Sequence, residues 1–298
     1  MNLIALLLAL IVERLAAHWL HLREPQWFDG YFEWTLRRFS RTRGARAVFI
    51  ALIFTILPVL PIAAIAFTFS EWLSGLEYVA FAAFVLIFSF GPRDLKEETD
   101  DYLSALARGD AADAARAARA LMEHDARQRL RAAPNTIEDA IFVQANNRVF
   151  GVAFWFLVAG PAGAWFFRVT DLMRRHAVME HRDLFEQAQR GLDFVHGVQA
   201  IHGVLAWLPA RLLAIGYAVA GSFDDAFASW RALVRERLSG SVERNDEVLM
   251  HVGRGALGAM DPERGSAHRC RAAMQLVWRA SLIWLVVVAV LVLFGRIV

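Results

Sequence analysis

The chain has 298 residues, of which 57% are hydrophobic, and its mean hydropathy is +0.37. Soluble domains contain ~45–50% apolar residues, so this composition excludes a soluble globular protein. The single cysteine, Cys270, excludes an internal disulfide and a CxxC metal site. The net charge of +2 and the pI near 9.0 indicate basic loops that face the anionic lipids of a bilayer, and we predict no nucleic-acid partner.

Residues 1–22 form the first predicted membrane helix. The first twelve residues contain no Lys or Arg, whereas a signal peptide carries positive charge before its apolar core, so we expect no cleaved signal. The whole segment is long enough to span, because a bilayer needs ~20 residues. Glu13, Arg14 and His18 are then intramembrane polar residues, and we expect Glu13 and Arg14 to face the helix bundle. Arg14, His18 and His21 share one helical face, which either lines a ligand cavity or snorkels to the interface.

Apolar runs further along the chain predict the other membrane helices. Four uncharged runs are expected to span, and a fifth candidate is interrupted by Pro209 and Arg211. In chain order these five runs are residues 48–69, 78–92, 149–167, 196–223 (the interrupted one) and 280–295. Together with the N-terminal segment, they predict an all-α, polytopic helical membrane protein with five to six membrane segments.

The run at 149–167 contains Gly160, Pro161 and Gly163, and five arginines follow it before residue 191. If this run crosses the membrane, those arginines lie outside, against the positive-inside tendency. Two interpretations stay open at this point. Either the external loop is unusually basic, or the segment is a re-entrant helix that is broken at its Gly-Pro-Gly stretch.

Changes in polarity divide the chain into five predicted segments. They are 1–91, with three membrane helices and an arginine-rich interfacial stretch; 92–147, a soluble helical hairpin; 148–223, membrane segments of which one is crossing or re-entrant; 224–273, an arginine-rich cytoplasmic loop; and 274–298, a C-terminal membrane helix. In the hairpin, Gly109 is a natural end for the first helix and Asp110 is a natural cap for the second. The parity of the crossings places the hairpin in the cytoplasm.

Three stretches carry a resemblance to a known family. LLLALIVERL, NTIEDAIFVQANNRVFGVAFWFLVAGPAGAWFFR and LAWLPARLLAIGYAVAGSFDDAFASW resemble the AmpE family of bacterial inner-membrane proteins, in the same order over nearly the whole chain. The most specific pattern consists of Trp207, Pro209, Arg211, Leu212, Tyr217, Ala218 and Gly221. The resemblance implies a multi-pass protein of the inner membrane. It also implies a modulator of inducible β-lactamase expression, and hence of antibiotic resistance, paired with the AmpD amidase of cell-wall recycling.

AmpE-like proteins are in turn distantly similar to the CobD/CbiB family of adenosylcobinamide-phosphate synthases, which implies an ancestral site for ATP, Mg²⁺ and amide-bond formation. The positions that match the synthase pattern are Asp125, Glu138, Asn146 or Asn147, Phe154, Trp155 and Arg211. A second glutamate of that pattern becomes Gln144 or Ala145, and an aspartate is missing before Gly151. Because Mg²⁺ on a triphosphate needs hard oxygen ligands, these losses argue against retained synthase activity. We therefore predict no cofactor, with ATP and Mg²⁺ required only if the synthase chemistry persists.

A set of polar residues is the candidate ligand site. Asn146, Asn147 and Arg148 lie at the start of a membrane segment, where amides suit a polar headgroup or a sugar-peptide ligand. Arg148 and Arg168 add positive charge for a carboxylate or phosphate. Helix capping with lipid-phosphate contact is the alternative. Arg211 lies in an apolar run and needs an anionic partner, for which the sequence offers Asp125, Glu138 and Asp171.

The sequence thus leads to two main hypotheses, with no catalytic and no metal-binding residue assigned. The first is a non-catalytic inner-membrane regulator of the AmpE type, whose partners are the bilayer and a cell-wall fragment or a protein of the recycling pathway; a homo-oligomer stays open. The alternative is a membrane enzyme related to the cobinamide-phosphate synthases. A third hypothesis, a transporter of a small solute or lipid precursor, rests on the broken helix and is weakened by the lack of a detectable repeat.

Overall fold

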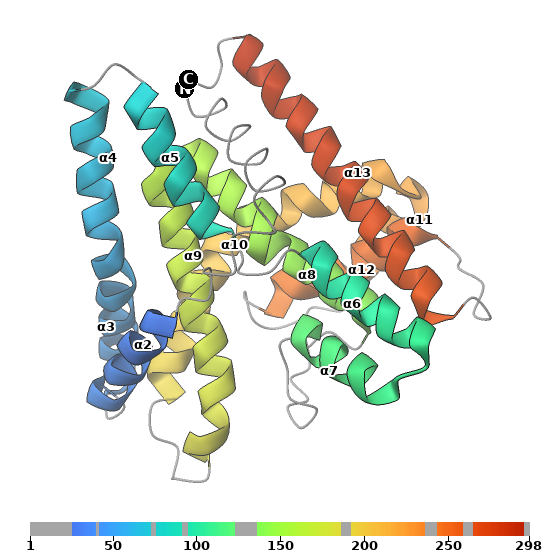
Figure 1. Ribbon diagram of the computed structural model, residues 1–298, viewed down its shortest axis with the longest axis horizontal. Helices are drawn as coiled ribbons and strands as arrows, with labels where there is room; N and C mark the ends of the chain where they lie inside the picture. The colour runs from blue at the N-terminus through green and yellow to red at the C-terminus, as the bar shows by residue number, and fades with distance from the viewer. Residues whose placement is uncertain are drawn as a thin grey trace. The chain divides into compact units, whose positions relative to one another are not determined.

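The computed structural model describes residues 26–39, 42–72, 76–90, 95–122, 136–185, 192–235, 243–258 and 265–294 (Figure 1). Every regular element in these ranges is a helix, so the all-α prediction is confirmed. The predicted N-terminal helix with Glu13, Arg14, His18 and His21 lies outside the described residues, and so does Asp125.

The chain divides into two compact units, and each unit is built from separate stretches of sequence. Unit 1 contains residues 1–92, 151–205 and 298, and unit 2 contains residues 93–150 and 206–297. The five segments predicted from the sequence describe placement in a membrane, and they stay a prediction. The chain passes between the units at Phe150 and Gly151, and again inside the helix α10 (Leu192–Ala220), between Leu205 and Ala206.

Unit 1 combines three strongly apolar helices with helices that also carry charged residues. Its elements are α2 (Gln26–Phe39), α3 (Ala45–Ile56), a 3₁₀ turn η2 (Leu57–Val59), α4 (Leu60–Trp72), α5 (Leu76–Ser89), α9 (Gly151–Phe185) and α10 (Leu192–Ala220) as far as Leu205. The short 3₁₀ turn begins beside Pro58, because a proline in a helix removes one backbone donor. The core of this unit contains Phe28 and Phe32 of α2 against Met173 and Phe194.

Tyr31 shows how α2 is held on α3. Its hydroxyl donates a hydrogen bond of 2.7 Å to the carbonyl oxygen of Phe54. Burial raises the pKa of the Tyr31 phenol to about 12, so the group stays a neutral donor at physiological pH. The predicted interfacial stretch is therefore packed on a membrane helix through its aromatic face.

Helix α9 is broken at the Gly-Pro-Gly stretch and turns back on itself. Gly160 has a φ of 64°, a conformation that side-chain-bearing residues rarely adopt, and Pro161 follows it. A Cβ atom added at Gly163 would lie 2.4 Å from the carbonyl oxygen of Trp155. In a straight helix these two residues are ~12 Å apart along the axis, so the two arms must fold together. Figure 1 shows the two arms, light green and yellow-green, meeting at this break.

Unit 2 contains two helical hairpins around a buried central helix. Its elements are α6 (Leu95–Arg108), α7 (Ala111–Met122), α8 (Ile137–Ala145), a π-helical turn η3 (Asn146–Phe150), α10 from Ala206, α11 (Phe223–Arg235), α12 (Glu243–Leu257) and α13 (Ser266–Leu293). The first hairpin is the one the sequence predicts. Gly109 has a φ of 72°, and the Asp110 carboxylate accepts hydrogen bonds from the backbone N–H groups of Ala112 and Asp113.

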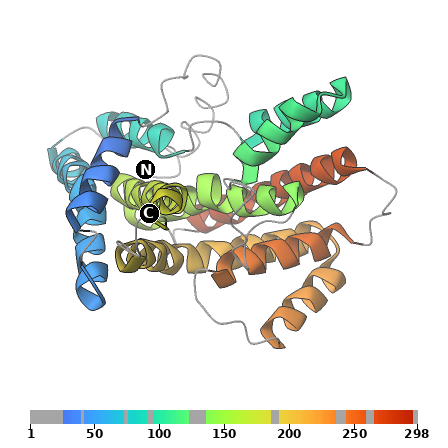
Figure 2. The ribbon, with the colours of Figure 1, turned by 90° about the horizontal axis from the view of Figure 1, so that it is seen from below.

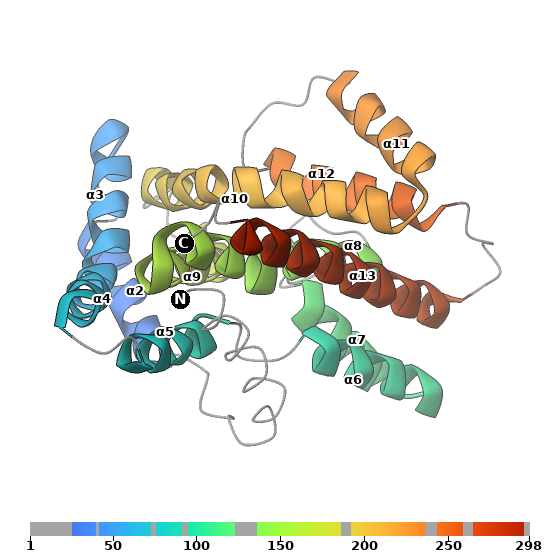
Figure 3. The same cartoon turned by 90° about the horizontal axis from the view of Figure 1, so that it is seen from above.

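Helix α8 is the centre of unit 2, because every one of its residues is buried. It packs against α7, α12 and α13, and Figure 3 shows it beside α12 and α13. The Tyr217 hydroxyl donates to the carbonyl oxygen of Phe142 at 3.1 Å, which ties α10 to α8. Gly253 of α12 leaves room for the Phe142 ring, since an added Cβ would lie 2.5 Å from it. Polar residues on α8 are consequently shielded from solvent.

Four described helical stretches are long and apolar enough to cross a membrane. They are Ala45–Thr68, Ile137–His176, Asp193–Ala220 and Ser266–Leu293, and Glu77–Ser89 is a shorter apolar helix. Many of their side chains are exposed, such as Val204 at 70% and Leu293 at 83%, which suits contact with lipid. The chain is therefore a polytopic helical membrane protein. The predicted crossing by residues 78–92 falls on α5, whose 14 residues reach only ~21 Å of the ~30 Å hydrocarbon core.

The close approach of the two arms of α9 predicts that Gly163→Ala destabilises the protein. The added methyl group meets a backbone carbonyl that cannot rotate away, and such overpacking costs about 1–3 kcal/mol. The matched control is Gly30→Ala in α2, where nothing lies within 4 Å and alanine favours the helix. We expect a lower melting temperature in detergent for Gly163→Ala and no decrease for Gly30→Ala. Equal melting temperatures for the two variants would contradict the fold-back.

Candidate functional site

The first turn of α8 carries two buried carboxylates. Thr136 caps this helix, and its hydroxyl accepts a hydrogen bond from the backbone N–H of Asp139 at 3.3 Å. Asp139 has no exposed surface and Glu138 is 8% exposed. Acidic side chains are favoured here because the N-terminal end of a helix carries partial positive charge. The local sequence, Thr-Ile-Glu-Asp, thus both starts the helix and places its charges.

Each of these carboxylates contacts an arginine from a distant part of the chain. Both oxygens of Asp139 accept from the Arg254 guanidinium of α12, at 2.5 Å each. This two-bond arrangement is the strong geometry for an arginine and a carboxylate. An oxygen of Glu138 lies 3.0 Å from Nε of Arg269 of α13. The ion pairs therefore fix α8 to α12 and α13.

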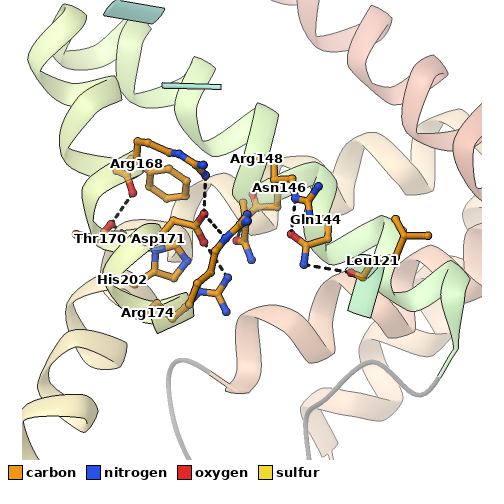
Figure 4. Close-up of polar contacts among 12 residues, drawn as sticks. Leu121, Gln144, Asn146, Arg148, Arg168, Thr170, Asp171, Arg174 and His202 are labelled. Atoms are coloured by element: carbon orange, nitrogen blue, oxygen red, sulfur yellow. Dashed lines mark hydrogen bonds and ion pairs between the residues drawn. The ribbon is translucent and has the colours of Figure 1, made fainter. Parts of the chain in front are cut away.

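A third ion pair, buried on both sides, joins the α6–α7 hairpin to the π-helical turn. Arg148 of η3 donates to the Glu98 carboxylate of α6 at 2.8 Å, and both side chains are at most 10% exposed. Arg148 also donates to the Gln144 side-chain oxygen at 3.2 Å, and the Gln144 amide reaches the Leu121 carbonyl at 3.5 Å. Figure 4 shows Arg148, Gln144 and Leu121 in this chain of contacts. Both helices of the hairpin are thus bound to the segment 144–148 by polar groups.

The π-helical turn places two amide side chains in the interior of unit 2. Asn146 is fully buried and donates to the side-chain oxygen of Asn147 at 3.2 Å. The Oδ1 atom of Asn146 has no hydrogen-bond partner among the described residues. Single π-helical turns are frequently found at functional sites, and a buried acceptor without a donor costs stability. This turn is the best candidate in unit 2 for contact with a polar ligand.

The guanidinium group of Arg211 in α10 contacts three neutral groups. It donates to the Asn245 side-chain oxygen at 2.7 Å and to the Trp207 carbonyl at 2.8 Å. Its guanidinium also lies 4.3 Å from the centre of the Trp207 ring, which is a cation–π contact. Of the anionic partners that the sequence offers, Glu138 and Asp171 are engaged by other arginines.

Unit 1 contains a second polar cluster, centred on Asp171 in the second arm of α9. This carboxylate has no exposed surface, and three arginines of the same helix contact it. Its oxygens lie 3.0 Å from Arg168, 2.8 Å from Arg174 and 2.9 Å from Arg175. The spacing of three and four residues puts all four side chains on one helical face. The shared carboxylate thus offsets part of the positive charge that the three arginines bring into unit 1.

A histidine from α10 approaches the same face. The Thr170 hydroxyl donates to the Phe167 carbonyl at 2.7 Å and lies 3.4 Å from Nδ1 of His202. The His202 ring also packs on the ring of Phe167, with 5.2 Å between centroids. Figure 4 shows Arg168, Thr170, Asp171, Arg174 and His202 together. The cluster can bind or orient an anionic group, since guanidinium groups suit carboxylates and phosphates.

The predicted ligand residues that the structure describes fall in both units. Those in unit 2 are Glu138, Asn146, Asn147, Arg148 and Arg211, and those in unit 1 are Arg168 and Asp171. The sequence predicts that Arg148 and Arg168 together supply positive charge to one ligand, and in the structure Arg148 is in unit 2 and Arg168 is in unit 1. Their role in ligand binding stays a prediction.

Several polar residues of these clusters were missed by the sequence argument. They are Glu98, Asp139, Asn245, Arg254 and Arg269 in unit 2, and Thr170, Arg174, Arg175 and His202 in unit 1. One of them had a usable signal. Glu98 falls on the face of α6 that also buries Leu95, Tyr102 and Ala105, and a charged residue at an apolar position of the helical pattern points to a buried ion pair.

The described residues do not fit a magnesium–nucleotide site. Such a site needs several carboxylate oxygens that face one space, whereas Glu98, Glu138 and Asp139 each contact a different arginine. Across the described part of the chain, no three His, Cys, Asp or Glu side chains gather as metal ligands do. The geometry favours a site that recognises polar or charged groups through amides and guanidinium groups.

Comparison with known proteins identifies two groups of relatives. A family described as "Regulatory signalling modulator protein AmpE" matches residues 1–298. Protein AmpE of Shigella flexneri is 24% identical over 308 aligned positions, which cover 100% of both chains. The cobalamin biosynthesis protein CobD of Stutzerimonas stutzeri is 29% identical over 259 residues, 80% of each chain. CobD of Chromobacterium violaceum is 29% identical over 224 residues, 73% of this chain and 64% of that protein. No solved structure matches.

The buried pair of Glu98 and Arg148 predicts that Glu98→Gln strongly destabilises the protein. Removing one partner leaves a buried charge uncompensated, which costs about 3–5 kcal/mol. The double variant Glu98→Gln, Arg148→Gln removes both charges and is expected to recover part of that loss. Glu33→Gln is the matched control, because the pair of Glu33 with Arg37 is exposed and worth under about 1 kcal/mol.

Thermal unfolding of the purified variants in detergent measures this prediction. The expected order of melting temperatures is wild type and Glu33→Gln highest, then the double variant, then Glu98→Gln. A Glu98→Gln variant as stable as the Glu33→Gln variant would show that the pair does not hold the hairpin to η3.

Proposed function

Because this chain belongs to the AmpE family of regulatory signalling modulator proteins, we propose that it is a non-catalytic regulator in the bacterial inner membrane. It modulates the induction of β-lactamase, and hence antibiotic resistance, according to the state of cell-wall recycling. A ligand or a protein of the recycling pathway acts on it at the cytoplasmic face. The observation that carries this proposal is that the family match extends over residues 1–298, including the stretches that build both polar clusters.

The arrangement of unit 2 supports a binding role without chemistry. Glu98, Glu138 and Asp139 contact arginines, so they are poorly placed to hold a metal or to transfer protons. The amides of Asn146 and Asn147, beside Arg148, suit a ligand that carries amide, hydroxyl and carboxylate groups. Sugar-peptide fragments of the cell wall carry all three kinds of group.

The alternative is an enzyme related to the cobinamide-phosphate synthases. The 29% identity to the Stutzerimonas stutzeri CobD protein over 80% of this chain favours it, and Glu138 matches the synthase pattern. Under this alternative, Glu138 must release Arg269 before it can serve as a ligand or base. The regulator is preferred because it needs no such rearrangement.

The regulatory proposal predicts that deletion of the gene in its natural host changes β-lactamase induction. β-Lactamase activity is measured before and after exposure to a β-lactam at a concentration that does not stop growth. Expression of the wild-type protein from a plasmid is expected to restore the parental response, and the empty plasmid is the control. Unchanged induction in the deletion strain would contradict the proposal.

Ligand binding separates the regulator from the enzyme. Purified protein in detergent is heated with cell-wall sugar-peptide fragments, or with ATP, Mg²⁺ and a cobinamide precursor together. The regulator predicts a higher melting temperature with the fragments alone, because ligand binding stabilises the folded state. A rise with ATP and the precursor that is lost in Glu138→Gln would favour the enzyme.

A further inference from the structure

Helix α11 carries an exposed apolar stripe along one of its faces. Phe223, Phe227 and Val234 are 56%, 47% and 68% exposed, and their spacing of four and seven residues puts them on one face. The rings of Phe223 and Phe227 are nearly parallel, with 5.9 Å between centroids. The stripe is therefore a continuous apolar surface along the helix.

A different face of α11 packs against α12. Ala226 and Leu233 are buried, and α12 is the described element on which this helix packs. An added Cβ at Gly255 of α12 would lie 2.7 Å from the Asp225 carbonyl oxygen, and the Ser222 N–H donates to the Ala256 carbonyl at 2.8 Å. Figure 2 shows α11, in light orange, on the outer side of α12. The apolar stripe is thus additional to the face that folds the unit.

The position of α11 in the chain places it beside a bilayer. Only two residues separate the end of the apolar helical stretch Asp193–Ala220 from Phe223. Near that end, Ile215 and Val219 are exposed, as residues in contact with lipid are. A helix that begins so soon after a membrane span cannot be far from the headgroup region.

The two arginines in the second half of α11 also suit a lipid surface, and the acidic residues Asp224 and Asp225 lie in its first turn. Arg231 and Arg235 are exposed, and Arg231 borders the apolar stripe, since its guanidinium lies 4.9 Å from the centre of the Phe227 ring. An arginine beside an apolar stripe can bury its stem and reach lipid phosphates with its guanidinium. Amphipathic helices with aromatic residues on one face and arginine on the other lie in the plane of the membrane interface.

From these observations we propose that α11 is an interfacial helix that binds anionic phospholipid. Its stripe of Phe223, Phe227 and Val234 contacts the acyl chains, and Arg231 and Arg235 contact headgroup phosphates. The helix α12 is held at the same depth through its tight packing with α11. Because α12 supplies Asn245 to Arg211 and Arg254 to Asp139, the lipid surface thereby helps to position these polar contacts. This inference does not depend on the regulatory role.

Spin labels at two positions of α11 test the proposal in reconstituted vesicles of phosphatidylethanolamine and phosphatidylglycerol. Phe227→Cys places the label on the stripe, and Ala232→Cys, on the exposed polar side, is the matched control. Both are made in a Cys270→Ala background. If that background does not fold, Cys270 is retained, because it is fully buried, and its residual signal is subtracted. Collisions with oxygen, which concentrates in lipid, are compared with collisions with a water-soluble nickel chelate.

The expected result is that oxygen reaches the label at 227 more readily than the nickel chelate does, and that the preference is reversed at 232. Equal access of the nickel chelate to both labels would overturn the proposal, because the stripe would face water. A label at 227 that neither reagent reaches would also overturn it, because a second copy of the chain would then cover the stripe.

The preference for anionic lipid is tested in a second arm. The label at 227 is expected to lie deeper in vesicles with phosphatidylglycerol than in vesicles of phosphatidylcholine alone. Substitution of both Arg231 and Arg235 by glutamine is expected to remove this difference. The control replaces the exposed pair Arg116 and Arg119 of α7 and is expected to keep it. The same depth in both kinds of vesicle for the unsubstituted helix would overturn the role of the arginines.

Discussion

The contact of Asp139 with Arg254 is the constraint on which unit 2 depends. Asp139 has no exposed surface, so the cost of removing its carboxylate from water has to be offset by a cation that shares its oxygens. Arg254 meets both oxygens, and it lies 115 residues further along the chain. The pair therefore joins α8 to α12. Around it, Glu138 with Arg269 and Glu98 with Arg148 attach α13 and the α6–α7 hairpin to the same central segment.

In unit 1, a buried carboxylate is paired with arginines of its own helix. Asp171 sits among arginines three and four residues away, so the helical repeat itself brings the charges together. The long-range contact in that cluster comes from His202 on α10. The break at Gly160 matters here too, because it gives the second arm of α9, which carries this cluster, a direction different from that of the first arm.

These contacts show how the polar residues of this chain differ in their surroundings from what a synthase site needs. The chain retains a carboxylate at Glu138 and amides at Asn146 and Asn147, where it resembles the cobinamide-phosphate synthases. Its carboxylates, however, contact arginines. A buried carboxylate that contacts a guanidinium group is a poor ligand for Mg²⁺, since the cation would have to displace the arginine. Recognition of a ligand through amides and guanidinium groups is the chemistry that we propose for this segment.

The sequence by itself determined the features that depend on neighbouring residues. Its composition required a membrane protein, Gly109 and Asp110 set the turn of the hairpin, and the Gly-Pro-Gly stretch set the break in α9. Local backbone preferences and the length of apolar runs are sufficient for these features. Only the tertiary structure decided which arginine meets which carboxylate, because Glu98 and Arg148 are 50 residues apart and many arginines could serve equally well. The same holds for the fold-back at Gly163, where the contact is with a backbone atom that no side-chain pattern reveals.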